Sequence, residues 1–237
     1  MIALDVLLEH LRDNLESAAT DSDAEGVHQV RVATRRIASW LELAGRRSLR
    51  DDLRWLRRRA GALRDLDVLL ARGDTPAALR RKWVTARIKA HQELSAAARS
   101  ARVAGLLESL AIMPPISIQE ARARIPTIRA MVLRRGEQFC EDAVDTEALH
   151  RLRRGARRLR YALEWVGEDV KPLRRLQDVL GAANDAVVAL AHVDQEGNSP
   201  EDMRYREKMV VRLSEQIDEV VKEWGVHRPW IEKAGVV

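Results

Sequence analysis

The sequence is poor in cysteine, in aromatic residues and in long apolar runs, and each shortage excludes a class of protein. The one cysteine, Cys140, cannot form an intramolecular disulfide, and we predict that it is a small core residue rather than a nucleophile. No apolar run is long enough to cross a bilayer, and acidic Asp5 and Glu9 lie where a signal peptide carries basic residues. We therefore expect a cytoplasmic protein without redox chemistry.

Proline is also sparse, and the windows between the prolines carry an apolar period near 3.6 residues. No alternating pattern typical of strands interrupts it, so the sequence predicts an all-α protein. The predicted helices span residues 3–19, 25–46, 49–71, 76–109, 118–143, 146–168, 172–192 and 200–224. Signals for helix starts are Asp23 or Ser22, Asp145 or Thr146, and Ser199 with Pro200.

A proline-containing stretch from Ala111 to Ser117 divides the predicted helices into four and four, and the sequence repeats across it. Residues 28–42 match residues 150–164, which lie 122 positions later, and a second block at 56–65 matches one that lies 120 positions later, at 176–185. We therefore predict two four-helix bundle lobes, at about residues 1–112 and 116–237. The repeat predicts a pseudo-twofold axis that relates them and brings two copies of the matched segments together.

Arginine greatly outnumbers lysine, and in each repeat the arginines gather on one helix face. These stripes consist of His28, Arg31 and Arg35 in the first repeat and of His150, Arg153 and Arg157 in the second. The first has no acidic residue between positions 28 and 40, whereas ordinary surface helices place acids one turn away. A stripe about 10 Å long suits several successive phosphates, so we predict an extended anionic ligand.

The arginine excess also has two simpler causes that stay open. A GC-rich genome favours arginine codons, and charged stripes are commonly solvated or paired with acidic stripes on adjacent helices. Recurrence at the same three positions in both repeats favours a binding site. We assign no role to the four remaining histidines, His10, His91, His192 and His227.

Four motifs occur in order along the chain. They are His28-Gln-Val-Arg31-Val-Ala-Thr-Arg35-Arg36, then Arg64-Asp65-Leu66-Asp67, then the run from His150 to Glu164, and finally Leu176 to Gly181 with Asn184-Asp185. Together they resemble the CHAD family, the conserved-histidine alpha-helical domain, over essentially the whole chain. The resemblance implies two helical bundles with a basic cleft between them, and binding of inorganic polyphosphate at polyphosphate granules. It also implies no catalysis. We expect no cofactor and no metal.

Residue roles follow from the same resemblance. The phosphate contacts would be His28, Arg31, Arg35, Arg36, His150, Arg153, Arg157 and Arg158. A structural motif, in which a small residue allows close helix approach and a carboxylate orients a cation, would comprise Gly61, Arg64, Asp65, Gly181, Asn184 and Asp185. The second repeat departs from the pattern because Asn184 replaces the arginine and Gly155 interrupts the basic helix. Relatives are often fused to a CYTH-type domain, so a CYTH-type or polyphosphate-metabolising protein is an expected partner of this stand-alone module.

Three rival functions compete with polyphosphate binding. Nucleic-acid binding shares the basic character, but the chain shows no reader motif and no row of aromatic residues for base stacking. A phosphohydrolase would need a metal or base, and Asp65 and Asp67 point about 200° apart on a helix. A scaffold for an acidic protein is the third. We expect no nucleic-acid and no membrane partner.

Overall fold

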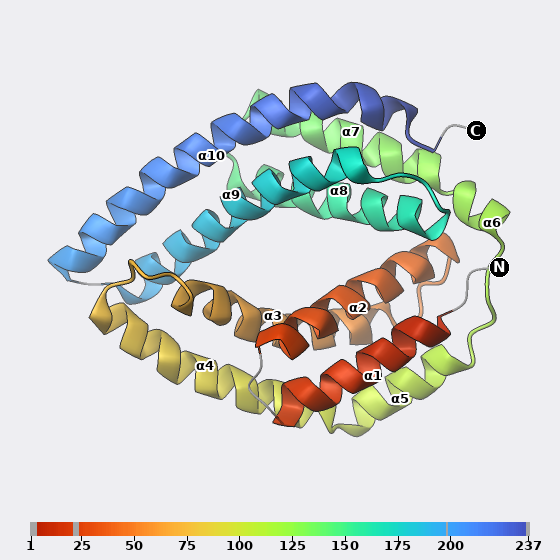
Figure 1. The fold of residues 1–237 in the computed structure, drawn as a ribbon, viewed down its shortest axis with the longest axis horizontal. Coiled ribbons are helices and arrows are strands. Elements are labelled where there is room, and N and C mark those ends of the chain that lie inside the picture. The colour runs from red at the N-terminus through yellow and green to blue at the C-terminus, as the bar shows by residue number, and fades with distance from the viewer. Residues whose placement is uncertain (1–3, 21–23, 198, 236–237) are drawn as a thin grey trace. The chain divides into compact units, whose positions relative to one another are not determined.

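Helices make up all the regular structure in the part of the chain that the computed structural model describes, residues 4–20, 24–197 and 199–235. The chain divides into two compact units, Met1–Ser117 and Ile118–Val237. Unit 1 holds α1 (Asp5–Thr20), α2 (Ala24–Leu43), α3 (Arg50–Leu70), α4 (Ala77–Ala98) and α5 (Ala101–Ala111) (Figure 1). Unit 2 holds α6 (Ile118–Arg122), α7 (Ile125–Glu141), α8 (Thr146–Trp165), α9 (Lys171–Glu196) and α10 (Pro200–Lys233). No helix within these ranges is both long and apolar enough to span a membrane.

Unit 1 is a four-helix bundle with one additional helix. α1 packs on α2 and α4, α3 packs on the same two helices, and α5 contacts α1, α3 and α4. The apolar stripes of these amphipathic helices meet in a core that includes fully buried Trp40 and Trp83. Ser95 on α4 donates to the carbonyl of Ala19 at 2.9 Å, which satisfies one of the carbonyls at the end of α1 that have no partner within the helix.

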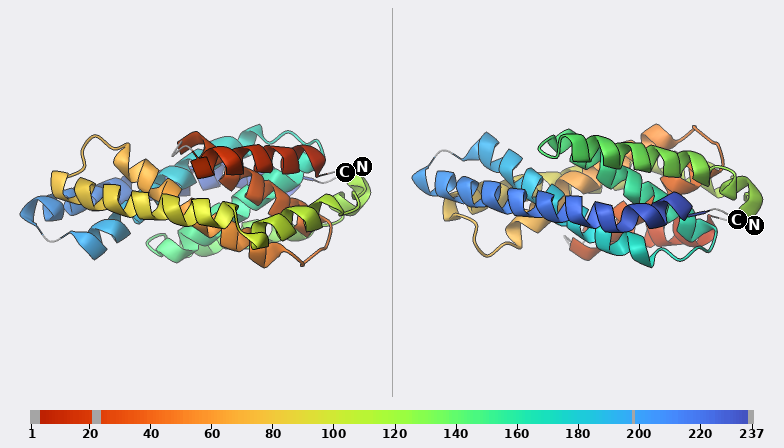
Figure 2. Two further views of the ribbon diagram at one scale, coloured as in Figure 1. Left: turned by 90° about the horizontal axis from the view of Figure 1, so that it is seen from below. Right: turned by 90° about the horizontal axis from the view of Figure 1, so that it is seen from above.

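Unit 2 repeats this arrangement with α7 to α10, and α6 lies against α7 and α8. The long α10 first pairs with α9 and then reaches α7 (Figure 2). Arg175 on α9 forms an ion pair with Glu219 at 2.7 Å. Farther along α10, the ring of Trp224 occupies the space beside Gly136, where a Cβ would lie only 1.9 Å from the ring. Gly136 therefore permits the close approach of α7 and α10.

The prediction of an all-α fold is confirmed, and so are two of its helix starts. Asp145 caps α8 by accepting a hydrogen bond from the Glu147 amide at 2.8 Å. Ser199 and Asp202 form a reciprocal capping box at α10. The predicted start at Asp23 or Ser22 lies outside the described residues. The predicted twofold relation between the lobes, and the cleft between them, stay predictions.

Three predicted helices have different bounds. The helix predicted over 76–109 is two helices, because Ser100 caps a new one by accepting from the Val103 amide at 3.3 Å. The helix predicted over 118–143 breaks between α6 and α7. The last helix continues past residue 224 and through Pro229, since buried Trp224 and Ile231 hold its end against the unit.

The prediction that Cys140 is a core residue is wrong. Cys140 is exposed in the last turn of α7. Phe139, one position earlier, takes the fully buried place. Successive helical residues are turned by about 100°, so the cysteine side chain emerges toward solvent.

Candidate functional site

Arg31 on α2 is held by the neighbouring helix α3. Its Nη1 donates to the carbonyl oxygen of Gly61 at 3.0 Å and to Oδ1 of Asp65 at 3.1 Å. The arginine side chain is only 14% exposed, whereas the aspartate is 42% exposed. A Cβ on Gly61 would lie 3.7 Å from the same Nη1, so the guanidinium rests directly on the glycine. Arg31 therefore has a carboxylate partner that comes from another helix.

His28 lies one turn before Arg31 and is half-buried among cations. Burial lowers the pKa of His28 below its ordinary value, and the charge of Arg64 on α3 is the next largest cause. Arg35 acts in the same direction, while Glu25 opposes it. The neutral imidazole is thus favoured in the free protein, and a bound anion would raise the pKa of His28 again.

His150 on α8 has a different kind of neighbour. Its Nδ1 lies 3.0 Å from Oδ1 of Asn184 on α9. With the amide oxygen as acceptor, Nδ1 carries the proton and Nε2 of the neutral ring is the acceptor. Burial lowers the pKa of His150, and the hydrogen bond to Asn184 acts in the opposite direction. The amide therefore fixes the ring orientation of a half-buried histidine.

Arg64 and Asn184 occupy matching positions of the repeat, and each neighbours the histidine of its own unit. The sequence-based prediction assigned both residues to a structural motif and missed this relation. The repeat alignment contained the signal, because it places each of them at the same position relative to a histidine helix. Their different chemistry makes the two histidine sites unequal.

The remaining predicted residues differ in their surroundings. Arg158 turns toward α7, where its Nη1 lies 3.6 Å from the sulfur of Met131, and burial lowers the pKa of the arginine. Gly181 has no atom within 4 Å of a would-be Cβ, in contrast to Gly61. Asp185, the acid of the predicted structural motif in unit 2, is half-buried. So are the other predicted phosphate contacts, Arg35, Arg36, Arg153 and Arg157.

The two carboxylates of the Asp65-x-Asp67 segment engage different helices. Asp65 contacts Arg31 on α2, and buried Asp67 accepts from Arg87 Nε on α4 at 2.7 Å. Among the residues with described positions, no three His, Cys, Asp or Glu side chains form a cluster suited to a metal. The segment stabilises helix packing on both sides of α3.

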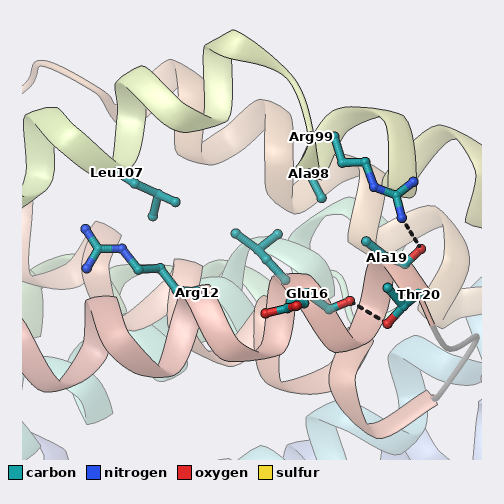
Figure 3. A pocket seen from close by; sticks show the side chains of 8 residues that line it. Arg12, Glu16, Ala19, Thr20, Ala98, Arg99 and Leu107 are labelled. Atoms are coloured by element: carbon teal, nitrogen blue, oxygen red, sulfur yellow. Dashed lines mark hydrogen bonds between the residues drawn. The ribbon is translucent and has the colours of Figure 1, made fainter.

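A pocket of about 310 Å³ lies elsewhere in unit 1, between α1, α4 and α5 (Figure 3). Its lining includes Arg12, Glu16, Arg99 and Leu107, and none of the predicted phosphate contacts. Arg99 donates to Ser95 Oγ at 2.8 Å and to the Ala19 carbonyl at 3.5 Å. That arginine ties the end of α1 to α4, and the pocket stays separate from the histidine site.

Comparisons with known proteins agree with this architecture. The CHAD domain family model matches residues 2–194. The crystal structure of the CHAD domain from the plant Ricinus communis is 26% identical, with 93% of this chain and 88% of that chain covered at a TM-score of 0.74. PptA from Streptomyces chartreusis shares the fold at 19% identity and a TM-score of 0.60, with 99% of each chain covered. A search of curated proteins finds no match. The resemblance inferred from the motifs is confirmed, and the chain belongs to the CHAD domain family.

Proposed function

We propose that this protein binds inorganic polyphosphate without catalysis, through the histidine and arginine faces of α2 and α8. The observation that carries the proposal is that each unit sets a half-buried histidine among arginines on one helix face. A linear polyanion supplies closely spaced charge without bases. Membership of the CHAD family supports the same ligand class.

Preorganisation in unit 1 favours phosphate recognition. Both contacts of Arg31 to α3 use Nη1, so Asp65 and Gly61 fix the guanidinium plane while its other N–H groups can meet phosphate oxygens. Arginine binds phosphate with two parallel hydrogen bonds and keeps its charge at every accessible pH. A side chain that is already oriented loses less entropy on binding.

The proposal is non-catalytic because the two carboxylates of the Asp65-x-Asp67 segment already hold arginines. Metal-assisted phosphoryl transfer needs carboxylates that converge on one ion. Asp65 and Asp67 instead form ion pairs with Arg31 and Arg87 on different helices. Nucleic acid is the weaker candidate, since fully buried Trp40 offers no ring for base stacking.

A matched pair of double variants tests the proposal. Arg35→Gln with Arg157→Gln removes one charge from each candidate face. The control, Arg54→Gln with Arg206→Gln, removes two exposed charges paired with Asp51 and Asp194. In titrations with labelled long-chain polyphosphate at fixed salt, the first variant should weaken binding at least about tenfold, because charged hydrogen bonds contribute about 1.5 kcal/mol or more each. The control should bind like the wild type.

Three outcomes would contradict the proposal. Equal weakening in both variants would mean general charge attraction rather than a site. Preference for single-stranded DNA over polyphosphate in competition would support the nucleic-acid alternative. Release of phosphate from polyphosphate with magnesium or manganese would establish an enzyme. Far-UV circular dichroism of each variant checks that the fold is retained.

A further inference from the structure

Arginines gather beside the proposed site where α7 and α8 pack together in unit 2, and this line of contact is called the α7–α8 groove below. Arg135 on α7 lies against Gly155 on α8, where a Cβ would be 3.4 Å from both Cδ and Nη1 of the arginine. Its Nη1 donates to the carbonyl oxygen of Arg151 at 3.2 Å. Gly155, which interrupts the basic helix in the sequence, therefore makes room for a guanidinium from the facing helix.

Positive charge exceeds negative charge in this groove. Arg151 contacts Asp145 at 3.1 Å, and Arg154 contacts Glu147 at 3.3 Å. Two further arginines, Arg134 and Arg135, have no carboxylate within 4.0 Å among the residues that the structure describes. Burial lowers the pKa of Arg135, followed by the charges of Arg154, Arg134 and Arg151. The positive charges of these neighbouring arginines repel one another, and a bound anion would reduce the repulsion.

Unit 1 lacks three of the four arginines, so the bundle does not require them. At an offset of 122 residues, Asp13, Gln29 and Val32 stand where unit 2 has Arg135, Arg151 and Arg154, whereas Arg12 matches Arg134. Gln29 Oε1 lies 3.2 Å from His10 Nε2, and Gln29 donates to Glu25. The matching positions of unit 1 therefore carry much less positive charge.

Arg154 links the groove to the proposed site. It follows His150 by one helical turn, so the two residues are surface neighbours. Its charge acts on the imidazole of His150 and on the guanidinium of Arg135. An extended anion that contacts His150 can therefore pass Arg154 and reach Arg135 on α7 while it stays beside positively charged side chains.

We propose that the α7–α8 groove, formed by Arg134, Arg135, Arg151 and Arg154, is a second anion subsite that binds a further segment of the same extended polyphosphate chain. This inference rests on the proposed function. It makes the two units unequal, because only unit 2 has the subsite. It also predicts selection by chain length, since a chain that covers only the α8 face does not reach α7.

The test compares long-chain polyphosphate with tripolyphosphate. Arg134→Gln with Arg135→Gln should weaken binding of the long chain severalfold and flatten the slope of log affinity against log salt, by somewhat less than one unit per arginine. Binding of tripolyphosphate should stay unchanged. The matched control is Arg175→Gln with Arg206→Gln, which removes two exposed arginines paired with acids in the same unit. Arg134→Gln alone covers the case in which the double variant is unstable, because Arg134 is exposed and its loss leaves the Arg135 packing intact.

Two results would overturn the subsite. In the first, the Arg134 and Arg135 double variant binds long-chain polyphosphate with the same affinity and salt slope as the control variant. In the second, the double variant weakens the binding of long-chain polyphosphate and of tripolyphosphate equally. The Arg35 and Arg157 double variant, measured in the same titrations, separates the two proposals. If that variant loses binding while the groove variant does not, the subsite alone fails. If neither loses binding, the proposed function fails with it.

Discussion

The two units place the same motif in different surroundings. In unit 1, α3 fixes the arginine, since Asp65 and Gly61 hold Arg31, and the histidine faces a cation. In unit 2, α9 supplies an amide that fixes His150. The repeated motif therefore does not give its two histidines the same chemistry, because Arg64 and Asn184 differ at the matching position of the partner helices.

The two units also differ at a matching position of α1 and α7. In unit 1, Asn14 on α1 donates to the His10 carbonyl of the same helix at 2.7 Å. In unit 2 the position 122 residues later is Gly136, which lies beside Trp224 of α10. This position is therefore polar in α1, whereas in α7 it allows the close apolar approach of another helix.

The largest expected effect comes from adding a side chain at Gly136, where α7 and α10 approach closely. Gly136→Ala places a Cβ 1.9 Å from the buried Trp224 ring, and overpacking of this kind costs about 1–3 kcal/mol or more. We expect a corresponding loss in the free energy of unfolding, measured by urea denaturation. The control is Gly181→Ala, which meets no atom within 4 Å and should be neutral or slightly stabilising. Similar stabilities for the two variants would contradict the described contact.

A smaller effect is expected when Arg31 loses the charge of its carboxylate partner. Asp65→Asn keeps a side-chain oxygen that can accept from Arg31 and orient it, but removes the negative charge that repels phosphate. Polyphosphate binding should tighten severalfold, with a stability cost below about 1 kcal/mol because the pair is partly exposed. Calorimetric titration measures the first quantity and thermal unfolding the second.

Asp51→Asn is the matched control for that variant. It removes another α3 carboxylate, one paired with Arg54 on the same exposed face. Tighter binding in both variants would show that only net charge changed. Unaltered binding in Asp65→Asn would show that Arg31 does not contact the ligand.

The smallest effect concerns pH and sharpens the difference between the histidines. The pKa values of His28 and His150 are both lowered in the folded protein, so the unfolded chain binds more protons near the ordinary histidine pKa of about 6.5. The contribution of the two neutral histidines to the free energy of unfolding is therefore complete above that pH. It is lost as the pH falls through that value toward the lowered pKa values. Arg64→Gln should raise the pKa of His28 and leave that of His150 unchanged, as followed by NMR of the imidazole protons. Equal shifts of both histidines would contradict the separate environments.

Polyphosphate should raise both pKa values, since an anion stabilises the imidazolium. Binding should therefore tighten as pH falls through the titration of the free histidines. Replacing His28 and His150 by glutamine should remove that dependence and keep the part of the affinity that arginine provides. An unchanged pH response in this double variant would assign the histidines a neutral role.

Prediction from sequence succeeded where the physical cause is local. Helical periodicity predicts the all-α fold because each helix must bury one apolar stripe, and caps such as Asp145 and Ser199 act within one turn. It failed at the break before α5, where Ser100 lies in an alanine-rich run that could equally have continued as helix. Propensity alone does not choose between a long helix and two capped ones.

By itself, the sequence determined the helical class, the repeat and the basic stripes, since these depend on residue type and spacing along one chain segment. Only the tertiary structure decided which partners the stripes meet. Asp65 is 34 residues from Arg31, as is Asn184 from His150, and Arg135 reaches the backbone of Arg151 from a different helix. Such contacts depend on the packing of antiparallel helices, in which distant residues become neighbours and burial changes their electrostatics, and no local pattern specifies them.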